Sequence, residues 1–477
     1  MWRTAIPNLR WPVILPPCMI LLCLSVLPAR AGTYFVDASR GNDASAGTSV
    51  ETAWRSLDRA NSTLAPGDTC LLRQGLYAQS RIAPARSGVA GAPVTYAAYR
   101  DEAAEVTGGK DGSIVDLTQR SHVTVRGLRI HSPTEHRWVV RISGEQAQHN
   151  RIEQCDVTDP EGERPIVIAE GASHNTVSGC TVHDTGSGNS GRGDCIVLTD
   201  QAHDNAVVGN TCYNGCHTQV MVIRGATHNL IVGNDLYATR RGWSGAGINI
   251  LLYSDDNVVV GNYIHDLGEI SDTKCAIQIC TRGNTIQSNV IVNVGGYGIS
   301  PQSYEYRGDR QEATGNLIAH NTVYQCGRPG LMVYDASDCV SRENRFVGNI
   351  VVGSTHDWDS QPVWLMLLSS QALPVPRRPA EWRGNTFTGN VFWHPEPGEQ
   401  NAVIYIYYGQ EKAVAVWSIR ELETAFPDVF ARNRLVNPQF MDPEHGDFHL
   451  NPGSPAGGAG ALSAGRRPID SLESRHN

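Results

Sequence analysis

The chain has 477 residues, and its 39 Lys and Arg against 48 Asp and Glu leave a formal net charge of −9. A net acidic chain is a poor candidate for general nucleic-acid binding, although a local arginine-lined groove for an anionic ligand stays compatible with it. Lysine is rare: Lys110, Lys274 and Lys412 are the three in the chain.

Residues 1–31 have the pattern of a cleaved export signal. Arg3 and Arg10 precede and enter an apolar run, and the small-residue motif "ARA" ends at Ala31. No apolar run of membrane-spanning length follows. We therefore expect a secreted or periplasmic mature chain that begins after Ala31, has no membrane span and is a monomer.

Residues 32–100 are expected to hold an N-terminal cap and the first strands. "TSVE" at 48–51 is a capping-box pattern, and Trp54, Leu57 and Ala60 follow at helical spacing. A short amphipathic helix here would cover the open end of a stacked β-structure, whose edges and core need protection.

Residues 101–395 are dominated by one repeated frame, illustrated by "NVVVGNYI" at 257–264. A weaker copy starts at Val123, and the complete copies start at Asn150, Asn175, Asn205, Asn229, Asn257, Asn284, Asn316, Asn344 and Asn385. Apolar residues alternate within each copy and a turn-rich segment follows, which favours strands over helices. Copies of about 25–30 residues indicate a solenoid. The repeats therefore predict an all-β, parallel β-helix of about ten coils.

The second asparagine of each copy is expected to stand at one corner of the solenoid. Stacked amides bond each other along such an axis, and asparagine tolerates left-handed turns. We interpret this column as a structural ladder, with Cys155 and Cys180 at the same position in two earlier coils. Its members are Asn210, Asn234, Asn262, Asn289, Asn321, Asn349 and Asn390.

Residues 396–477 are expected to form a C-terminal cap and tail. The segment "SIRELETAF" predicts a helix, and "DPEHGDFHL" predicts a strand. Residues 352–384 interrupt the repeat and are interpreted as an excursion from the solenoid.

These features together carry a resemblance. The start "YFVDASRGNDASAGTSVETAWRSLDRA", the segment "LAPGDTCLLRQGLY", the asparagine repeats and the end "NPQFMDPEHGDFHLNPGSPAGGAGA" resemble the secreted right-handed parallel β-helix superfamily. This superfamily is pectate-lyase-like and includes alginate and chondroitin lyases and related carbohydrate-active proteins. The resemblance implies a right-handed β-helix over nearly all of the mature chain, and its motifs belong to the caps and the ladder rather than to a catalytic site.

Candidate site residues come from the second strand of each repeat, aligned on its inward aliphatic residue. Strict alternation predicts that residues one and three before this aliphatic, and one after it, point outward. Three outward columns result, in which glycines leave room for a ligand. They contain His217, Lys274 and Arg328; then Gln219; then Asn249, Gln278 and Ser300. Arg240, Arg241 and Trp243 belong to a loop between these strands.

The residue types suggest acid–base chemistry on an anionic sugar. Elimination needs a base for the proton next to a carboxylate, a cation or metal that neutralises the carboxylate, and an acid for the leaving oxygen. Lys274, His217 and Arg240 are the catalytic candidates. Arg241, Trp243, Gln219, Asn249, Gln278 and Arg328 are the substrate-binding candidates. Asp194 is a candidate ligand for Ca²⁺, since this ion prefers oxygen ligands. The alternatives are a Lys274 paired with a loop acid, an exposed His217 and a turn-capping Asp194.

We therefore expect a polysaccharide lyase that cleaves an acidic, uronate-containing polysaccharide by β-elimination. Two alternatives stay open: a glycoside hydrolase or uronate epimerase acting on the same face, and a non-catalytic glycan-binding or cell-surface structural protein. The outward columns contain no clear pair of acids, which disfavours a hydrolase.

Overall fold

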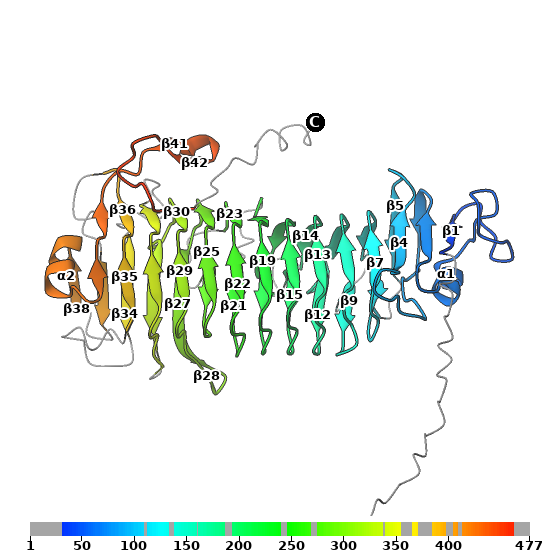
Figure 1. Cartoon of the computed structure of the whole chain (residues 1–477), viewed down its shortest axis with the longest axis horizontal. Coiled ribbons are helices and arrows are strands. Elements are labelled where there is room, and N and C mark those ends of the chain that lie inside the picture. Colours follow the sequence, from blue (N-terminus) through cyan, green and yellow to red (C-terminus); the bar gives the residue numbers. More distant parts are fainter. Residues whose placement is uncertain are drawn as a thin grey trace, which may run out of the picture.

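Each coil of the chain contributes one short strand to each of three parallel sheets, and the coils stack into a rod (Figure 1). The computed structural model describes residues 31–108, 112–132, 138–159, 161–186, 193–239, 246–268, 274–336, 339–353, 365–370, 384–396, 404–408 and 413–461. Within these residues sheet A has fourteen strands, and sheets B and C have thirteen each. The predicted parallel β-helix is confirmed, and the stack is longer than the ten coils recognised in the sequence.

Sheet A begins each repeat and contains the first apolar run of the asparagine frame. Its strands, in stacking order, are β1 (Thr33–Val36), β2 (Thr69–Leu72), β4 (Val94–Ala98), β7 (Val123–Arg126), β10 (Arg151–Glu153), β13 (Thr176–Ser178), β16 (Ala206–Val208), β19 (Leu230–Val232), β22 (Val258–Val260), β25 (Thr285–Gln287), β29 (Leu317–Ala319), β32 (Arg345–Val347), β35 (Thr386–Thr388) and β39 (Phe430–Ala431).

Sheet B follows the second asparagine of each repeat. Its strands are β3 (Gly75–Tyr77), β5 (Ala104–Thr107), β8 (Arg129–His131), β11 (Asp156–Asp159), β14 (Thr181–Thr185), β17 (Thr211–Gly215), β20 (Asp235–Tyr237), β23 (Tyr263–His265), β26 (Val290–Val292), β30 (Thr322–Tyr324), β33 (Ile350–Val352), β36 (Val391–Trp393) and β40 (Arg434–Leu435).

Sheet C completes each coil and contains the aligned strands from which the candidate residues were chosen. Its strands are β6 (Val115–Asp116), β9 (Val140–Ser143), β12 (Ile166–Ala169), β15 (Asp194–Leu198), β18 (Thr218–Val222), β21 (Ala246–Ile250), β24 (Cys275–Ile279), β27 (Tyr297–Tyr306), β31 (Leu331–Asp335), β34 (Met366–Ser370), β37 (Ile404–Tyr408) and β38 (Ala413–Trp417), with β28 (Asp309–Gln311) paired to β27.

The asparagine column predicted from the sequence forms the expected ladder. In each step the side-chain oxygen of one asparagine accepts hydrogen bonds from the backbone and side-chain amides of the asparagine one coil before it. Asn262, for example, donates to Asn289 Oδ1 through its backbone nitrogen at 3.0 Å and through Nδ2 at 2.9 Å. The same pattern runs from Asn210 to Asn433. Its role in the fold is therefore confirmed.

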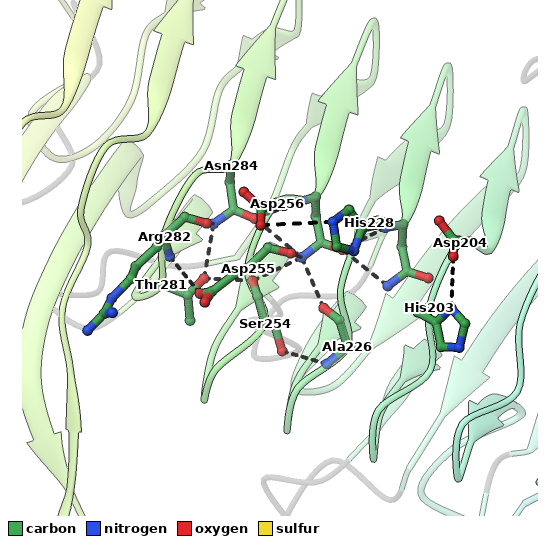
Figure 2. Close-up of polar contacts among 12 residues, drawn as sticks. His203, Asp204, Ala226, His228, Ser254, Asp255, Asp256, Thr281, Arg282 and Asn284 are labelled. Atoms are coloured by element: carbon green, nitrogen blue, oxygen red, sulfur yellow. Dashed lines mark hydrogen bonds and ion pairs between the residues drawn. The ribbon is translucent and has the colours of Figure 1, made fainter. Parts of the chain in front are cut away.

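The first asparagine of each repeat forms a second ladder, at the corner between sheets C and A, which the sequence analysis did not foresee. Asn257 donates through its backbone nitrogen to Asn284 Oδ1 at 2.9 Å, and its Nδ2 also donates to the Ala226 carbonyl at 3.0 Å. Figure 2 shows this corner, where Ser254 and Thr281 add further hydrogen bonds. In the coils that the two ladders join, two corners are thus fixed by buried, hydrogen-bonded amides.

The interior between the sheets is filled by aliphatic side chains, one above another. Every aligned aliphatic of sheet C is fully buried, namely Ile196, Val220, Ile248, Ile277, Ile299 and Leu331. Toward the C-terminal end the filling becomes aromatic. Phe346, Phe387 and Phe430 stack with ring centroids 4.5 and 5.0 Å apart. This continuous core makes neighbouring coils depend on one another for burial.

Helices lie at both ends of the rod (Figure 1). Helix α1 (Leu57–Thr63) buries Leu57 and Ala60 at the N-terminal end, and α2 (Ile419–Ala425) has a full capping box between Ser418 and Glu421. The predicted C-terminal helix is confirmed. The N-terminal helix exists, but its predicted start at 48–51 is wrong.

The start of α1 is set by Ser56, whose side chain accepts a hydrogen bond from the Arg59 backbone nitrogen at 3.2 Å. Asp43 in turn accepts hydrogen bonds from the backbone nitrogens of Arg55 and Ser56, which fixes the approach to the helix. A 3-10 turn (Pro443–His445) connects β41 (Phe440–Asp442) to β42 (Asp447–Leu450), the strand predicted near the C-terminus. No helix among the described residues is long and apolar enough to cross a membrane.

Candidate active site on the outer face of sheet C

Polar side chains gather on the outer face of sheet C over β15, β18, β21, β24 and β27. Met221, Asn249, Gln278 and Ser300 are partners in the register of these adjacent strands. The column predicted from Asn249, Gln278 and Ser300 therefore exists, with one residue contributed by each of three successive coils. The roles assigned to these residues stay predictions.

In the aligned strands of sheet C, the residue directly before the inward aliphatic residue also faces the interior. Cys195 and Ala276 occupy this position and belong to the main hydrophobic core. At Gly247 an added Cβ would lie 2.8 Å from Cγ2 of the buried Ile264, so the space there is already filled. Two consecutive residues thus point inward, and strict alternation, on which the sequence analysis relied, fails at this point.

This irregularity corrects the prediction for Gln219, which is fully buried. Its Oε1 atom accepts hydrogen bonds from the backbone nitrogen of Gly215 and from Sγ of Cys195, both at 3.2 Å. Gln219 therefore stabilises the entry into β18 from inside. It does not lie on the outer face, and the prediction that it binds substrate there is wrong.

Asp194 and His217 form a close pair at the edge of sheet C where its strands begin. His217 Nδ1 lies 2.7 Å from Asp194 Oδ1, and Arg164 Nε lies 3.6 Å from the other carboxylate oxygen. Asp194 is almost fully buried, whereas the His217 side chain is 36% exposed. Because a carboxylate only accepts hydrogen bonds, Nδ1 donates to it, and Nε2, which has no partner among the described residues, is left for other chemistry.

The surroundings of Asp194 do not fit the predicted Ca²⁺ site. Its two oxygens face His217 and Arg164, which are donors, whereas calcium needs six or more oxygen ligands. Among the described residues, no group of three or more His, Cys, Asp or Glu side chains is placed to hold a metal ion. The same carboxylate is well suited to orient His217.

Lys274 lies close to this pair, although it is two coils further along. Burial lowers the pKa of its amine below the ordinary value, while Cys216 and Asp194 are near enough to oppose that shift. The amine makes no hydrogen bond or ion pair to any described residue. Gly296 passes directly beside the backbone of Lys274, where a Cβ would lie 2.1 Å from the lysine carbonyl oxygen. Lys274 thus stands at the register position of His217, two coils further along, with a pKa that burial lowers.

Asn249 lies on the coil between His217 and Lys274. Its Nδ2 donates to Thr218 Oγ1 at 3.2 Å, and this hydroxyl is in turn 3.3 Å from His217 Nδ1. Its Oδ1 is buried and has no hydrogen-bond partner among the described residues. A buried acceptor without a donor costs free energy, so such an atom needs an explanation.

Further polar groups continue along the face toward β27. Gln278 Nε2 donates to Gln302 Oε1 at 2.8 Å, and Gln302 Nε2 donates to Ser300 Oγ at 3.1 Å. Arg328 follows in the register line of His217 and Lys274, since its backbone nitrogen donates to the Gly296 carbonyl at 3.1 Å. Arg240, Arg241 and Trp243 lie outside the described residues.

Sequence reasoning named Asp194 and His217 separately and missed their pairing. They are 23 residues apart, and the assumed alternation placed Asp194 inward. Arg164, which lies before β12 and contacts Asp194, carried no signal that could have identified it. The stacking of coils brings all three together.

Two family descriptions match overlapping parts of the chain. "Pel9A-like, right handed beta helix region" matches residues 34–222, and "Right handed beta helix region" matches residues 194–363. A curated relative, the lacto-N-biosidase of Bifidobacterium longum subsp. longum, is 40% identical over 74 residues, which are 14% of this chain and 5% of that protein. The chain therefore spans a small fraction of the length of that relative.

Two solved structures are similar at low sequence identity. Pectate lyase Pel9A is 16% identical, with 70% of this chain and 82% of that chain covered and a TM-score of 0.42. An alginate lyase from Paenibacillus sp. str. FPU-7 is 14% identical, with 79% and 97% covered and a TM-score of 0.39.

Proposed function

Because the chain belongs to the right-handed parallel β-helix superfamily, we propose that it is a carbohydrate-active protein that cleaves an acidic, uronate-containing polysaccharide by β-elimination. The observation that carries the proposal is the Lys274 amine, whose pKa is lowered by burial, on the same outer face as the Asp194–His217 pair. Export, which residues 1–31 predict, would bring such a protein to extracellular polymers.

In this reaction Lys274 is the general base. In its unprotonated form the amine takes the proton from the sugar carbon next to the carboxylate, and burial favours that form by lowering the pKa of the amine. The electron pair of that C–H bond forms a carbon–carbon double bond as the bond to the glycosidic oxygen breaks. The protonated Nε2 of His217 gives its proton to the departing oxygen, while Asp194 holds the ring through Nδ1.

The polymer itself is expected to satisfy the groups that have no partner in the described structure. A sugar hydroxyl donates to Asn249 Oδ1, and Gln278 and Arg328 lie further along the face. Arg240 and Arg241, from the loop before β21, are the proposed cations for the substrate carboxylates. No step in this scheme depends on a metal, because the residues around Asp194 do not fit one.

The test is the product and its dependence on Lys274. Elimination creates an unsaturated uronate that absorbs in the ultraviolet, whereas hydrolysis creates reducing ends without that absorbance, and epimerisation changes the sugar without breaking the chain. Lys274→Ala should lower turnover on the cleaved polymer by about a hundredfold or more. Arg345→Ala is the matched control, because it removes a cation exposed on sheet A, away from this face.

Both variants should keep the melting temperature of the unsubstituted protein. An unsaturated product that forms at the same rate with Lys274→Ala would contradict the role of the lysine. Reducing ends without absorbance would instead support the hydrolase, and binding without any product would support a glycan-binding protein.

A further inference from the structure

Two exposed tyrosines meet at one place on the rod, although they are 53 residues apart in the sequence. Tyr253 is 58% exposed and Tyr306 is 43% exposed. Among the large apolar side chains that are exposed in the described residues, these two are the aromatic ones. Water-exposed aromatic rings at a shared position are typical of a binding surface rather than of chance exposure.

The tyrosines are joined by a hairpin that extends from sheet C. Strand β27 continues past the sheet and turns back at Arg307 and Gly308 into β28, which projects from the rod (Figure 1). Both turn residues have positive φ angles, 55° and 89°, which is the conformation of the tightest two-residue hairpin turn. In this hairpin Tyr306 is directly opposite Asp309.

The hairpin reaches back over the coil of β24 to the turn that follows β21. Tyr253 donates from its hydroxyl to Asp309 Oδ1 at 2.9 Å, and the Leu252 backbone nitrogen donates to Gln311 Oε1 at 3.0 Å. Two hydrogen bonds therefore fix the Tyr253 ring against the hairpin. No described aromatic ring stacks on it, and the Tyr253 residue keeps 58% of its surface exposed.

The backbone of this turn has the conformation of the equivalent turns of earlier coils. Leu252 and Tyr253 have φ angles of 48° and 62°, in the left-handed region, and Asp200 and Gln201, at the equivalent positions after β15, have φ angles of 48° and 66°. The turn geometry therefore belongs to the solenoid. Tyr253 differs from Gln201 in placing an aromatic side chain, 58% exposed, at this position.

The hairpin lies at the edge of sheet C where its strands end. Lys274 and His217 lie at the opposite edge, where the strands begin. Lys274 and Gln278 are four residues apart on one strand, which corresponds to about 13 Å. Gln278 Nε2 lies 3.5 Å from the hydroxyl of Tyr304, the hairpin residue nearest the sheet. The polar face is thus continuous from the proposed catalytic residues to the base of the hairpin.

We infer that Tyr253 and the hairpin around Tyr306 form a sugar-binding subsite, in which a pyranose ring of the acidic chain stacks on the open face of Tyr253. The inference rests on the proposed function, and it adds a binding position about one strand length, roughly 13 Å or more, from Lys274. The Arg307 guanidinium lies 5.2 Å from the centre of the Tyr306 ring. It is the hairpin cation that meets the carboxylate of that sugar.

The experiment measures binding apart from cleavage. In the Lys274→Ala background, Tyr253→Ala should weaken binding of polygalacturonate or alginate by roughly tenfold, the effect of losing one aromatic anchor. Tyr253→Phe keeps the ring and loses only the bond to Asp309, so most of the affinity should stay. Leu76→Ala removes an equally exposed apolar side chain from sheet B and should change nothing.

With Lys274 intact, Tyr253→Ala should raise KM for the long polymer and leave the cleavage of disaccharide-sized substrates unchanged. The inference is overturned if Tyr253→Ala binds the acidic chains as well as Leu76→Ala does. If acidic chains do not bind but neutral xylan binds in a Tyr253-dependent manner, the subsite stands and the proposed substrate class is wrong. If none of these polymers binds to the protein with Tyr253 present, both proposals fail.

Discussion

Asn262 and Asn249 are both almost fully buried asparagines of neighbouring coils, yet their side chains are in opposite situations. In the ladder, Asn262 donates through Nδ2 to Asn289 Oδ1 and to the Ile231 carbonyl, and its own oxygen accepts from Asn234. On the outer face of sheet C, Asn249 Oδ1 has no partner among the described residues. Burial alone does not separate the two, whereas hydrogen-bond satisfaction does.

This difference distinguishes the parts of the molecule that build the rod from the part that awaits a ligand. The ladder amides are complete without any other molecule, so their role ends with the fold. The outer face holds three groups that have no partner in the described structure: Asn249 Oδ1, the Lys274 amine and His217 Nε2. A buried or half-buried polar group without a partner costs the unbound protein free energy, and a ligand that bonds to the group removes that cost.

Among the substitutions that test this comparison, the largest change in turnover is expected for Asp194. Asp194→Asn removes the charged acceptor that holds His217, so turnover should fall by about tenfold to a hundredfold and the acidic side of the pH–rate profile should change. Asp116→Asn is the matched control, since Asp116 is paired with Arg81 at 2.7 Å near the N-terminal end of the same sheet. An unchanged pH–rate profile for Asp194→Asn would show that the pair has only a structural role.

A paired substitution tests the comparison directly. Asn262→Leu takes the acceptor from the Asn234 backbone nitrogen, leaves Asn234 Nδ2 with its bond to the Val207 carbonyl alone, and removes the side-chain donor to the Ile231 carbonyl. The loss should lower the free energy of unfolding by about 1–3 kcal/mol. Asn249→Leu gives up one bond to Thr218 and removes an unsatisfied acceptor, so its cost should be about 1 kcal/mol or less. Denaturant unfolding measures both.

Substrate affinity should respond in the reverse order, with Asn249→Leu weakening binding and Asn262→Leu leaving it unchanged. The comparison breaks if Asn249→Leu destabilises the protein as strongly as Asn262→Leu does. In that case Asn249 is a structural residue whose partner is missing for another reason.

A third polar region, on the outer face of sheet B, resembles the ladder in having its partners. His183, Tyr213, Tyr237 and His265 stack in successive coils, with ring centroids 4.8, 5.2 and 4.9 Å apart. Each histidine lies between two aspartates, Asp156 and Asp184 for the first, and Asp235 and Asp266 for the second.

The smallest expected effect concerns these two histidines. Burial alone would lower their pKa values, but the hydrogen bonds to the aspartates raise both to about 9. The stabilisation that comes with a raised pKa is fully present below the unfolded pKa of 6.5. It is lost as the pH rises through the folded pKa of about 9. The free energy of unfolding should therefore decrease by roughly 1–3 kcal/mol per histidine between pH 6.5 and 9.

His183→Gln should flatten that part of the stability curve, as measured by melting at each pH. His445→Gln serves as the control, because His445 pairs with Asp442 at the exposed C-terminal hairpin. A stability curve that falls equally steeply in His183→Gln would show that other groups cause the decrease.

The fold could be predicted because its determinants are local and repeated. Two asparagines at fixed spacing, with apolar residues alternating between them, are enough to specify a corner and a strand in every coil. The start of α1 could not be found in the same way. Thr48–Glu51 has a good capping pattern, but the contacts of Asp43 with the backbone at Arg55 and Ser56 select a later start.

The site could be predicted only in part, because its geometry depends on one irregular step in sheet C. Lys274 was identified by its rarity, and His217 by its residue type. The pairing of His217 with Asp194 joins neighbouring coils across 23 residues, and the two consecutive inward positions at Cys195 and Ile196 break the alternation from which the outward positions were chosen. The β27–β28 hairpin had a weaker signal, since Gly308 suits the second position of its two-residue turn, but Arg307 stands where Asn, Asp or Gly is preferred.

Both ladders also affect how such a protein can change over generations. Within each ladder an asparagine bonds only to the asparagines one coil before and one coil after it, and Asn229 bonds Asn257 after 28 residues. Duplication or loss of one such segment in the gene would rejoin both ladders in register. His217 and Lys274 would then be separated by one coil more or one coil fewer, a step of about 4.8 Å. Gain or loss of a repeat would therefore change the distance between His217 and Lys274 only in steps of one coil. Smaller changes would have to come from the loops.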